Sequence, residues 1–65
     1  MDIDSKLREV YLYVAAEARM EESAARTMSE LTQYPVERVK RRWERAAILH
    51  RLADQIAQAK KELDR

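Results

Sequence analysis

The sequence contains no glycine, no cysteine and a single proline in its 65 residues. Without cysteine, neither a disulfide nor a thiolate metal site can hold the fold together. Without glycine and with one proline, there are few points at which a helix must end. The abundance of Ala, Glu, Arg, Lys, Leu and Gln is typical of helices joined by short connections. These features predict an all-α fold.

Long apolar runs are missing as well. No segment approaches the roughly 18 uncharged apolar residues of a transmembrane helix. Residues 1–4 also lack the basic start of a secretory signal. We therefore expect a cytoplasmic protein without a membrane partner.

The length of the chain limits its core. A domain of about 60 residues buries only about 60% of the surface that its unfolded chain exposes. Below roughly 70–80 residues, proteins without disulfides or metals depend on tight helix packing or on oligomerisation. We predict that residues 1–65 form a single small helical domain and that the protein is a homodimer.

The two halves of the chain differ in the sign of their charge, although the formal net charge is only +1. Acidic side chains outnumber basic ones by seven to four in residues 1–32, whereas basic ones lead by nine to five in residues 33–65. The excess lies within residues 37–51, which hold six basic and two acidic side chains. Such an asymmetry indicates an anionic partner.

The first half of the chain has a helical pattern. Asp4 can serve as the N-cap of a helix over residues 5–18. Its apolar face is formed by residues spaced by three and four, namely Ile3, Leu7, Val10, Tyr11, Val14 and Ala18. The sequence therefore predicts a helix that begins close to the N-terminus.

Residues 17–22 interrupt this pattern. Ser23 can then cap a second short helix, whose inward side chains are Ala24, Met28 and Leu31. The heptad positions nevertheless stay in register across the interruption and fail only at Glu17 and Glu21. One continuous helix over residues 4–32 is therefore the alternative.

The second half of the chain is predicted to be one long helix. Tyr34-Pro35 ends the preceding helix because the residue before a proline leaves the α region, whereas proline suits the first turn of a new helix. Nothing after Pro35 breaks a helix before the C-terminus, so the segment is about 30 residues long.

Two apolar stripes lie on different faces of this long helix. Near its start, one face carries Val36, Val39, Trp43, Ala46 and Ala47, and the roughly opposite face carries Arg38, Arg41, Arg42 and Arg45. Farther on, a seam on the side of the arginines consists of Leu49, Leu52, Ile56, Ala59 and Leu63. A straight helix cannot bury both stripes against one neighbour. We therefore expect either a bend near residues 46–47 or a dimer interface formed by the seam.

Residues 28–41 carry a resemblance to the helix-turn-helix of bacterial and phage repressors and activators, and with the flanking positions the resemblance covers about 20 of the 65 residues. The matching positions are Met28 and Ser29 (apolar and small), Gln33 (turn), and Tyr34 and Val39 (buried). Gln33 stands where the family usually has glycine. Arg42 stands where the family has an aliphatic residue, and Trp43 beside it takes the core face.

The resemblance implies two short helices followed by one long C-terminal helix, with the helix-turn-helix part in residues 1–47 and a dimerisation helix in residues 48–65. It places Val36, Glu37, Lys40 and Arg41 near base edges, and Arg26, Thr32, Gln33 and Arg38 near phosphates. The helical wheel turns Arg38, Arg41, Arg42 and Arg45 outward instead. Arg41 belongs to both sets and is the strongest candidate, because a guanidinium can pair bidentately with guanine.

The sequence contains no catalytic constellation, since it has no cysteine, one solitary histidine, His50, and no glycine-rich phosphate loop. We therefore predict that the protein is not an enzyme and has no cofactor or metal.

The favoured function is a small dimeric transcriptional regulator that binds double-stranded DNA with the basic helix after Pro35. The alternative is a protein-interaction module, an inhibitor or adaptor formed by a helical hairpin of residues 4–32 and 36–64 that self-associates into a bundle. An RNA-binding bundle would use the same arginines.

Overall fold

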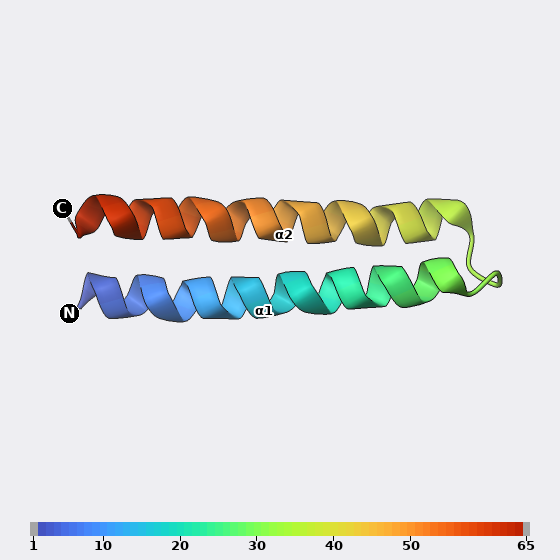
Figure 1. Ribbon diagram of the computed structural model, residues 1–65, viewed down its shortest axis with the longest axis horizontal. Coiled ribbons are helices and arrows are strands. Elements are labelled where there is room, and N and C mark those ends of the chain that lie inside the picture. Colours follow the sequence, from blue (N-terminus) through green and yellow to red (C-terminus); the bar gives the residue numbers. More distant parts are fainter. Residues whose placement is uncertain (1, 65) are drawn as a thin grey trace.

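The computed structural model describes residues 2–64, which form two helices of 28 residues each. Helix α1 spans Ile3–Glu30 and helix α2 spans Val36–Leu63. The two helices lie side by side and antiparallel, joined by a short connection, so that both ends of the chain lie at the same end of the molecule (Figure 1). The hairpin measures 48 × 14 × 14 Å. The all-α prediction is confirmed, and so is the two-helix antiparallel hairpin that was its alternative.

The arrangement of two short helices plus one long helix is wrong. Helix α1 runs without a break through residues 17–23, and Ser23 lies inside it as an ordinary exposed residue. The physical reason is that Ala, Arg, Met and Glu in this segment are all good helix formers. In a helix-turn-helix the two helices meet at about 90–120°, whereas α1 and α2 are antiparallel over their whole length (Figure 1). The structure therefore lacks the arrangement predicted for residues 1–47.

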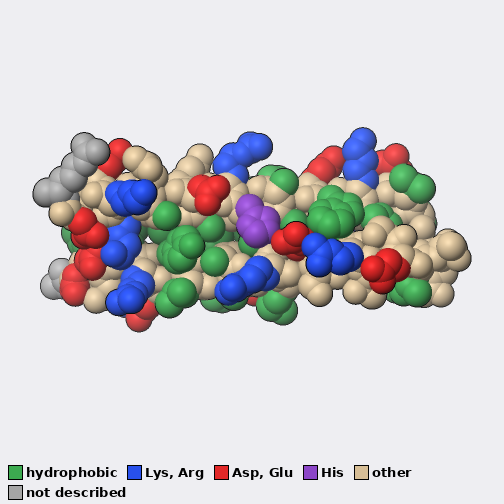
Figure 2. All heavy atoms as spheres, viewed as in Figure 1, with side chains coloured by type: hydrophobic (Ala, Val, Ile, Leu, Met, Phe, Trp, Pro, Cys, Tyr) green, Lys and Arg blue, Asp and Glu red, His purple; other side chains and the backbone are tan. Residues whose placement is uncertain are grey.

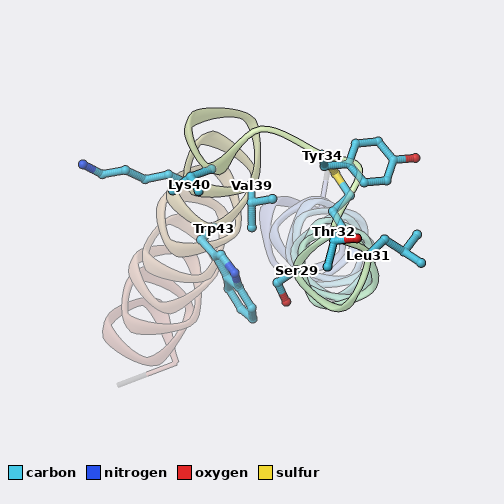
Figure 3. A pocket seen from close by; sticks show the side chains of 9 residues that line it. Ser29, Leu31, Thr32, Tyr34, Val39, Lys40 and Trp43 are labelled. Carbon is cyan, nitrogen blue, oxygen red and sulfur yellow. The ribbon is translucent and has the colours of Figure 1, made fainter.

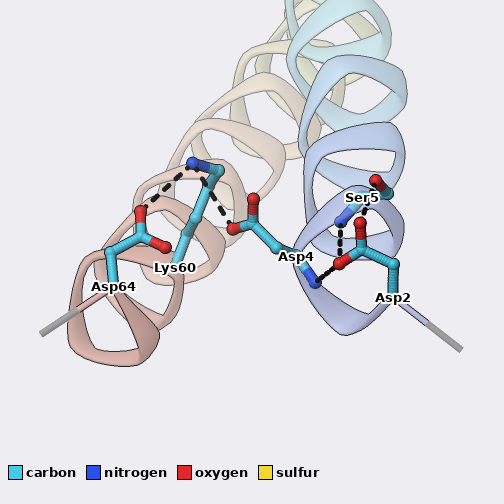
Figure 4. A network of polar contacts seen from close by, with 5 residues as sticks. All are labelled: Asp2, Asp4, Ser5, Lys60 and Asp64. Atoms are coloured by element: carbon cyan, nitrogen blue, oxygen red, sulfur yellow. Dashed lines mark hydrogen bonds and ion pairs between the residues drawn. The ribbon is translucent and has the colours of Figure 1, made fainter.

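Helix α1 begins two residues earlier than the sequence pattern suggested, because its N-cap is Asp2 and not Asp4. Asp2 Oδ1 accepts hydrogen bonds from the backbone N–H groups of Asp4 (3.1 Å) and Ser5 (3.4 Å). The Ser5 hydroxyl donates to Asp2 Oδ2 at 2.8 Å (Figure 4). The two aspartates flank Ile3, and the carboxylate of Asp2 is the one that reaches the free N–H groups of the first turn.

Protonation of Asp2 is expected to loosen the first turn of α1. The pKa of Asp2 is lowered from 3.8, mainly because the Ser5 hydroxyl and then the Ser5 backbone N–H donate to the carboxylate. The stabilisation is therefore complete above the ordinary pKa and is lost as the pH falls through the lowered pKa. The chemical shift of the Ser5 amide should report this titration. It should persist in Asp4→Ala and disappear in Asp2→Ala, and a midpoint at or above 3.8 in the wild type would contradict the assignment.

The connection between the helices forms where the sequence predicts it. Leu31 is extended, and its N–H donates to the carbonyl of Met28 at 3.2 Å. Pro35 is the N-cap of α2, and its carbonyl accepts from the N–H groups of Arg38 (3.0 Å) and Val39 (3.2 Å). The helix boundary at Tyr34-Pro35 and the long second helix are thus confirmed.

The core between the helices is made of small side chains. The buried apolar residues are Val14, Ala18 and Ala25 from α1 and Ala46 and Ala53 from α2. They are spaced by sevens or by combinations of three and four, so the two helices follow a heptad register. Alanines let the two backbones approach closely but bury little apolar area, so each contributes little to stability. No large side chain among residues 2–64 is fully buried.

Both apolar stripes of α2 lie partly against α1, whereas the sequence pattern predicted that a straight helix could not bury both against one neighbour. Val39, Ala46 and Ala53 are seven residues apart and face α1 together, and the seam of Leu49 and Ile56 is half-buried beside them. A repeat of seven residues stays on one side of a helix when the helices wind slightly around each other. Helix α1 therefore covers part of each apolar stripe of α2.

Candidate functional site

The heptad register gives the hairpin two different sides. Glu22 and His50 approach each other on one side, with 3.2 Å between Glu22 Oε2 and His50 Nε2. Trp43 lies one heptad before His50 and therefore on this side, which we call the tryptophan side. We call the opposite side the arginine side because it carries Arg38, Arg41 and Arg45. Figure 2 shows apolar side chains gathered along the seam between the helices, with charged side chains flanking it.

Four arginines of α2 lie together on the arginine side. They line a common hollow of about 230 Å³, and we call them the arginine cluster: Arg38, Arg41, Arg42 and Arg45. Their spacing of three and four places successive guanidinium groups on neighbouring turns of one helix face. The predicted outward set is thereby brought together.

Arg42 differs from the other members of the cluster because it is bonded across the hairpin. Its Nη1 donates to both carboxylate oxygens of Glu21, at 3.1 and 2.9 Å. The Glu21 side chain is 17% exposed and that of Arg42 is 40% exposed. The pair occupies core positions of the heptad register and joins α1 to α2. Arg42 therefore has a structural partner, whereas Arg38, Arg41 and Arg45 form no ion pair within residues 2–64.

Removing Glu21 is expected to destabilise the hairpin. Glu21→Gln leaves a partly buried guanidinium without its carboxylate, and we expect a loss of about 1–2 kcal/mol, between the values for exposed and for buried pairs. Urea unfolding at fixed chain concentration measures it. Glu9→Gln is the control, because Glu9 pairs with Lys6 at 3.5 Å and its side chain is 71% exposed. Equal losses in the two variants would contradict the special role of the Glu21–Arg42 pair.

The other residues predicted to bind DNA do not join the arginine cluster. Arg26 lies on α1 and donates to Glu22 at 3.3 Å. Gln33 lies in the connection, and Glu37 lies in the first turn of α2. Lys40 lines a pocket near the connection together with Trp43. Of the eight residues predicted to bind DNA, the structure brings four together in one cluster, namely Arg38, Arg41, Arg42 and Arg45.

The pocket near the connection has a volume of about 580 Å³. Figure 3 shows the Trp43 indole at the edge of the gap between the two helices, near Ser29, with Val39 above it in this view and Lys40 pointing away. The lining also includes Met28, Leu31, Thr32, Tyr34 and Val36. Trp43 is 39% exposed, so the expectation that it fills the core is wrong. The small residues of the seam bring the helices too close together for the indole to be buried in the core, so it lies over the seam and stays partly exposed.

The predicted dimer interface lies on the arginine side, toward the open end of the hairpin. Leu52 and Leu63 are exposed, whereas Leu49, Ile56 and Ala59 are half-buried beside α1. Helix α1 adds exposed residues to the same side, namely Ile3, Val10, Tyr13 and Met20. Their positions follow from the heptad register once the antiparallel pairing is known.

Charged residues close the open end of the hairpin. Lys60 Nζ lies 3.5 Å from Asp4 Oδ1 and 3.4 Å from Asp64 Oδ2 (Figure 4). Pairs this exposed stabilise a fold by less than about 1 kcal/mol. Within residues 2–64, no group of three or more His, Cys, Asp or Glu side chains is arranged to hold a metal ion.

The fold and the site define a two-helix antiparallel hairpin with a small-residue core, an arginine cluster and a large exposed apolar surface. Comparisons with family models, with curated proteins and with solved structures found no match to this chain. Neither α1 nor α2 combines the length and the apolar character that crossing a bilayer would require.

Proposed function

We propose that this protein is a helical interaction module that acts as a self-associated bundle, in which a second hairpin covers the apolar surface of the first. The observation that carries the proposal is the exposure of the large apolar side chains. Twelve of them are exposed among residues 2–64, while the buried apolar residues are four alanines and one valine. Soluble monomers rarely leave an apolar surface of this extent open to water.

The accessible surface supports the same proposal. The chain exposes 5475 Å², whereas a compact folded monomer of 7.7 kDa exposes roughly 4,300 Å². The excess of about 1,100 Å² exceeds the roughly 800 Å² that each partner contributes to a standard interface. Association of two hairpins would therefore bring the surface of each chain to the level of an ordinary small domain.

Light scattering and sedimentation equilibrium test this proposal. We expect a mass of twice 7.7 kDa at micromolar concentration, and an unfolding midpoint that rises with chain concentration, because association stabilises the folded state by mass action. A monomer whose unfolding midpoint is independent of concentration would contradict self-association.

The arginine cluster favours a second function, the binding of a nucleic acid duplex. Arg38, Arg41 and Arg45 are exposed, and they form no ion pair within residues 2–64. Four guanidinium groups that line one hollow repel one another, and a phosphate backbone relieves that repulsion. A mobility shift with random duplex DNA and duplex RNA at two salt concentrations tests this function. Binding through the arginine cluster requires that the affinity for the duplex falls steeply as the salt concentration rises.

A further inference from the structure

The arginine side of the hairpin has two unlike halves along its length. Asp4 lies beside Lys60 and Glu21 lies beside Arg42, so residues whose numbers add up to about 64 lie opposite each other. This pairing places the exposed apolar residues of the arginine side mainly in the half near the chain ends, which we call the terminal half. The other half, nearer the connection, holds the arginine cluster and is called the loop half.

The terminal half is apolar on both helices. Its exposed large side chains are Ile3, Val10 and Tyr13 from α1 and Ile48, Leu52 and Leu63 from α2, each between 42% and 68% exposed. Leu7, Leu49 and Ile56 lie half-buried between them. Among residues 2–64, Lys6 and Glu62 lie at its rim and the Lys60–Asp4 ion pair lies across its open end, whereas the register turns Asp2, Glu9 and Asp54 toward other faces. Seven of the twelve exposed large apolar residues lie on the arginine side, counting Met20 at the border with the loop half.

The loop half carries charge of mainly one sign. It holds the four arginines of the cluster and, from α1, Glu17 and Glu21. Glu21 is already bonded to Arg42. Covering this half with a second copy would take the remaining guanidinium groups out of water with too few carboxylates to pair them, and the desolvation of unpaired charges opposes association.

We propose that two copies of the chain pack against each other through the terminal halves of their arginine sides only, with their connections pointing in opposite directions. This arrangement rests on the proposed self-association and specifies its surface. It covers apolar surface with apolar surface and leaves both loop halves in water. If the hairpins overlapped fully with both connections at one end, the two arginine clusters would meet. If they overlapped fully with the connections at opposite ends, each apolar half would lie against the partner's arginines.

The consequence for function is that the dimer carries one arginine cluster at each end. In each copy the arginine cluster lies on the same side of the hairpin as the partner. The partner covers only the terminal half, so the cluster lies past the end of the partner and stays uncovered. The two clusters therefore lie on opposite faces of the dimer. Self-association and the binding of an anionic partner thus use neighbouring halves of one side without competing for the same residues.

A distance measurement between spin labels tests the arrangement. The chain has no cysteine, so Gln33→Cys in the exposed connection provides a single labelling site. Double electron–electron resonance on the full-length dimer should give a distance between the two labels that exceeds the 48 Å length of one hairpin. Glu9→Cys is the matched control, because residue 9 lies near the centre of the proposed overlap and its label should give a much shorter distance.

Each outcome of this measurement is decisive. A distance between the Gln33→Cys labels well below 48 Å would mean that the connections lie at the same end, and a distance close to 48 Å would mean full overlap. Either result overturns the proposed arrangement while leaving self-association intact. Light scattering of the same labelled samples separates the two claims, because a monomeric mass would overturn self-association as well.

Discussion

Replacing Leu52 with glutamate should convert the self-associated protein into a monomer. In the hairpin Leu52 is 42% exposed, so the substitution disturbs α1–α2 packing little. The same side chain lies in the terminal half, next to Ile48 and close to Tyr13, where a second copy would cover it in the proposed dimer. Losing the burial of a leucine costs about 1.5–3 kcal/mol, and burying the new carboxylate adds to this. Because both copies of the chain lose this contact, the dissociation constant should rise by about 100-fold or more.

Sedimentation equilibrium over a range of concentrations measures this change directly. The variant should also unfold at a midpoint that no longer depends on chain concentration. Leu12→Glu is the matched control, because Leu12 is 57% exposed and lies on α1 away from the arginine side. If both substitutions weaken association equally, the dimer does not form through the terminal half.

Replacing the three arginines of the cluster that form no ion pair within residues 2–64 should strongly weaken duplex binding while leaving the fold intact. The variant Arg38→Gln, Arg41→Gln, Arg45→Gln keeps Arg42, whose bond to Glu21 joins the helices. Each phosphate contact contributes about 0.9 to the slope of log affinity against log salt, so the slope should fall by about 2.7 if all three arginines bind phosphates. Titrations with duplex DNA and duplex RNA at several salt concentrations provide both the affinity and the slope.

The control for this experiment removes the same number of cations elsewhere. Arg8, Arg19 and Arg51 are exposed and lie outside the arginine side, so replacing all three with glutamine changes the net charge equally. An equal loss of binding in the control would show that net charge, and not the cluster, governs the affinity. Absence of duplex binding by the wild type at low salt would end the nucleic acid proposal.

Local rules predicted much of this fold correctly. The absence of glycine and the single proline led to long helices, and the restriction that Pro35 places on Tyr34 led to the position of the connection. The spacing of Arg38, Arg41, Arg42 and Arg45 was sufficient to place them on one face, because the periodicity of a helix is the same in every protein. Each of these predictions depends only on residues close together in the chain.

The continuity of α1 could not be decided in this way. Glu21 interrupts the apolar pattern, and such an interruption favours the end of one helix and the start of another. In the structure Glu21 occupies a core position because Arg42, 21 residues later, occupies the facing core position and pairs with it. Glu21 and Arg42 are charged residues at core positions, and they are favourable there only because the antiparallel register places them opposite each other. The pattern of one helix alone does not reveal this pairing.

By itself, the amino-acid sequence determined the helical class, the place where the chain reverses and the row of arginines, since these follow from backbone preferences and from helical periodicity. The tertiary structure alone decided that two helices suffice, that Trp43 lies over the seam, and that the apolar and cationic residues occupy separate halves of one side. These properties depend on which residues of α1 lie opposite which residues of α2. The close approach of the helices at Ala18, Ala25, Ala46 and Ala53 determines that register.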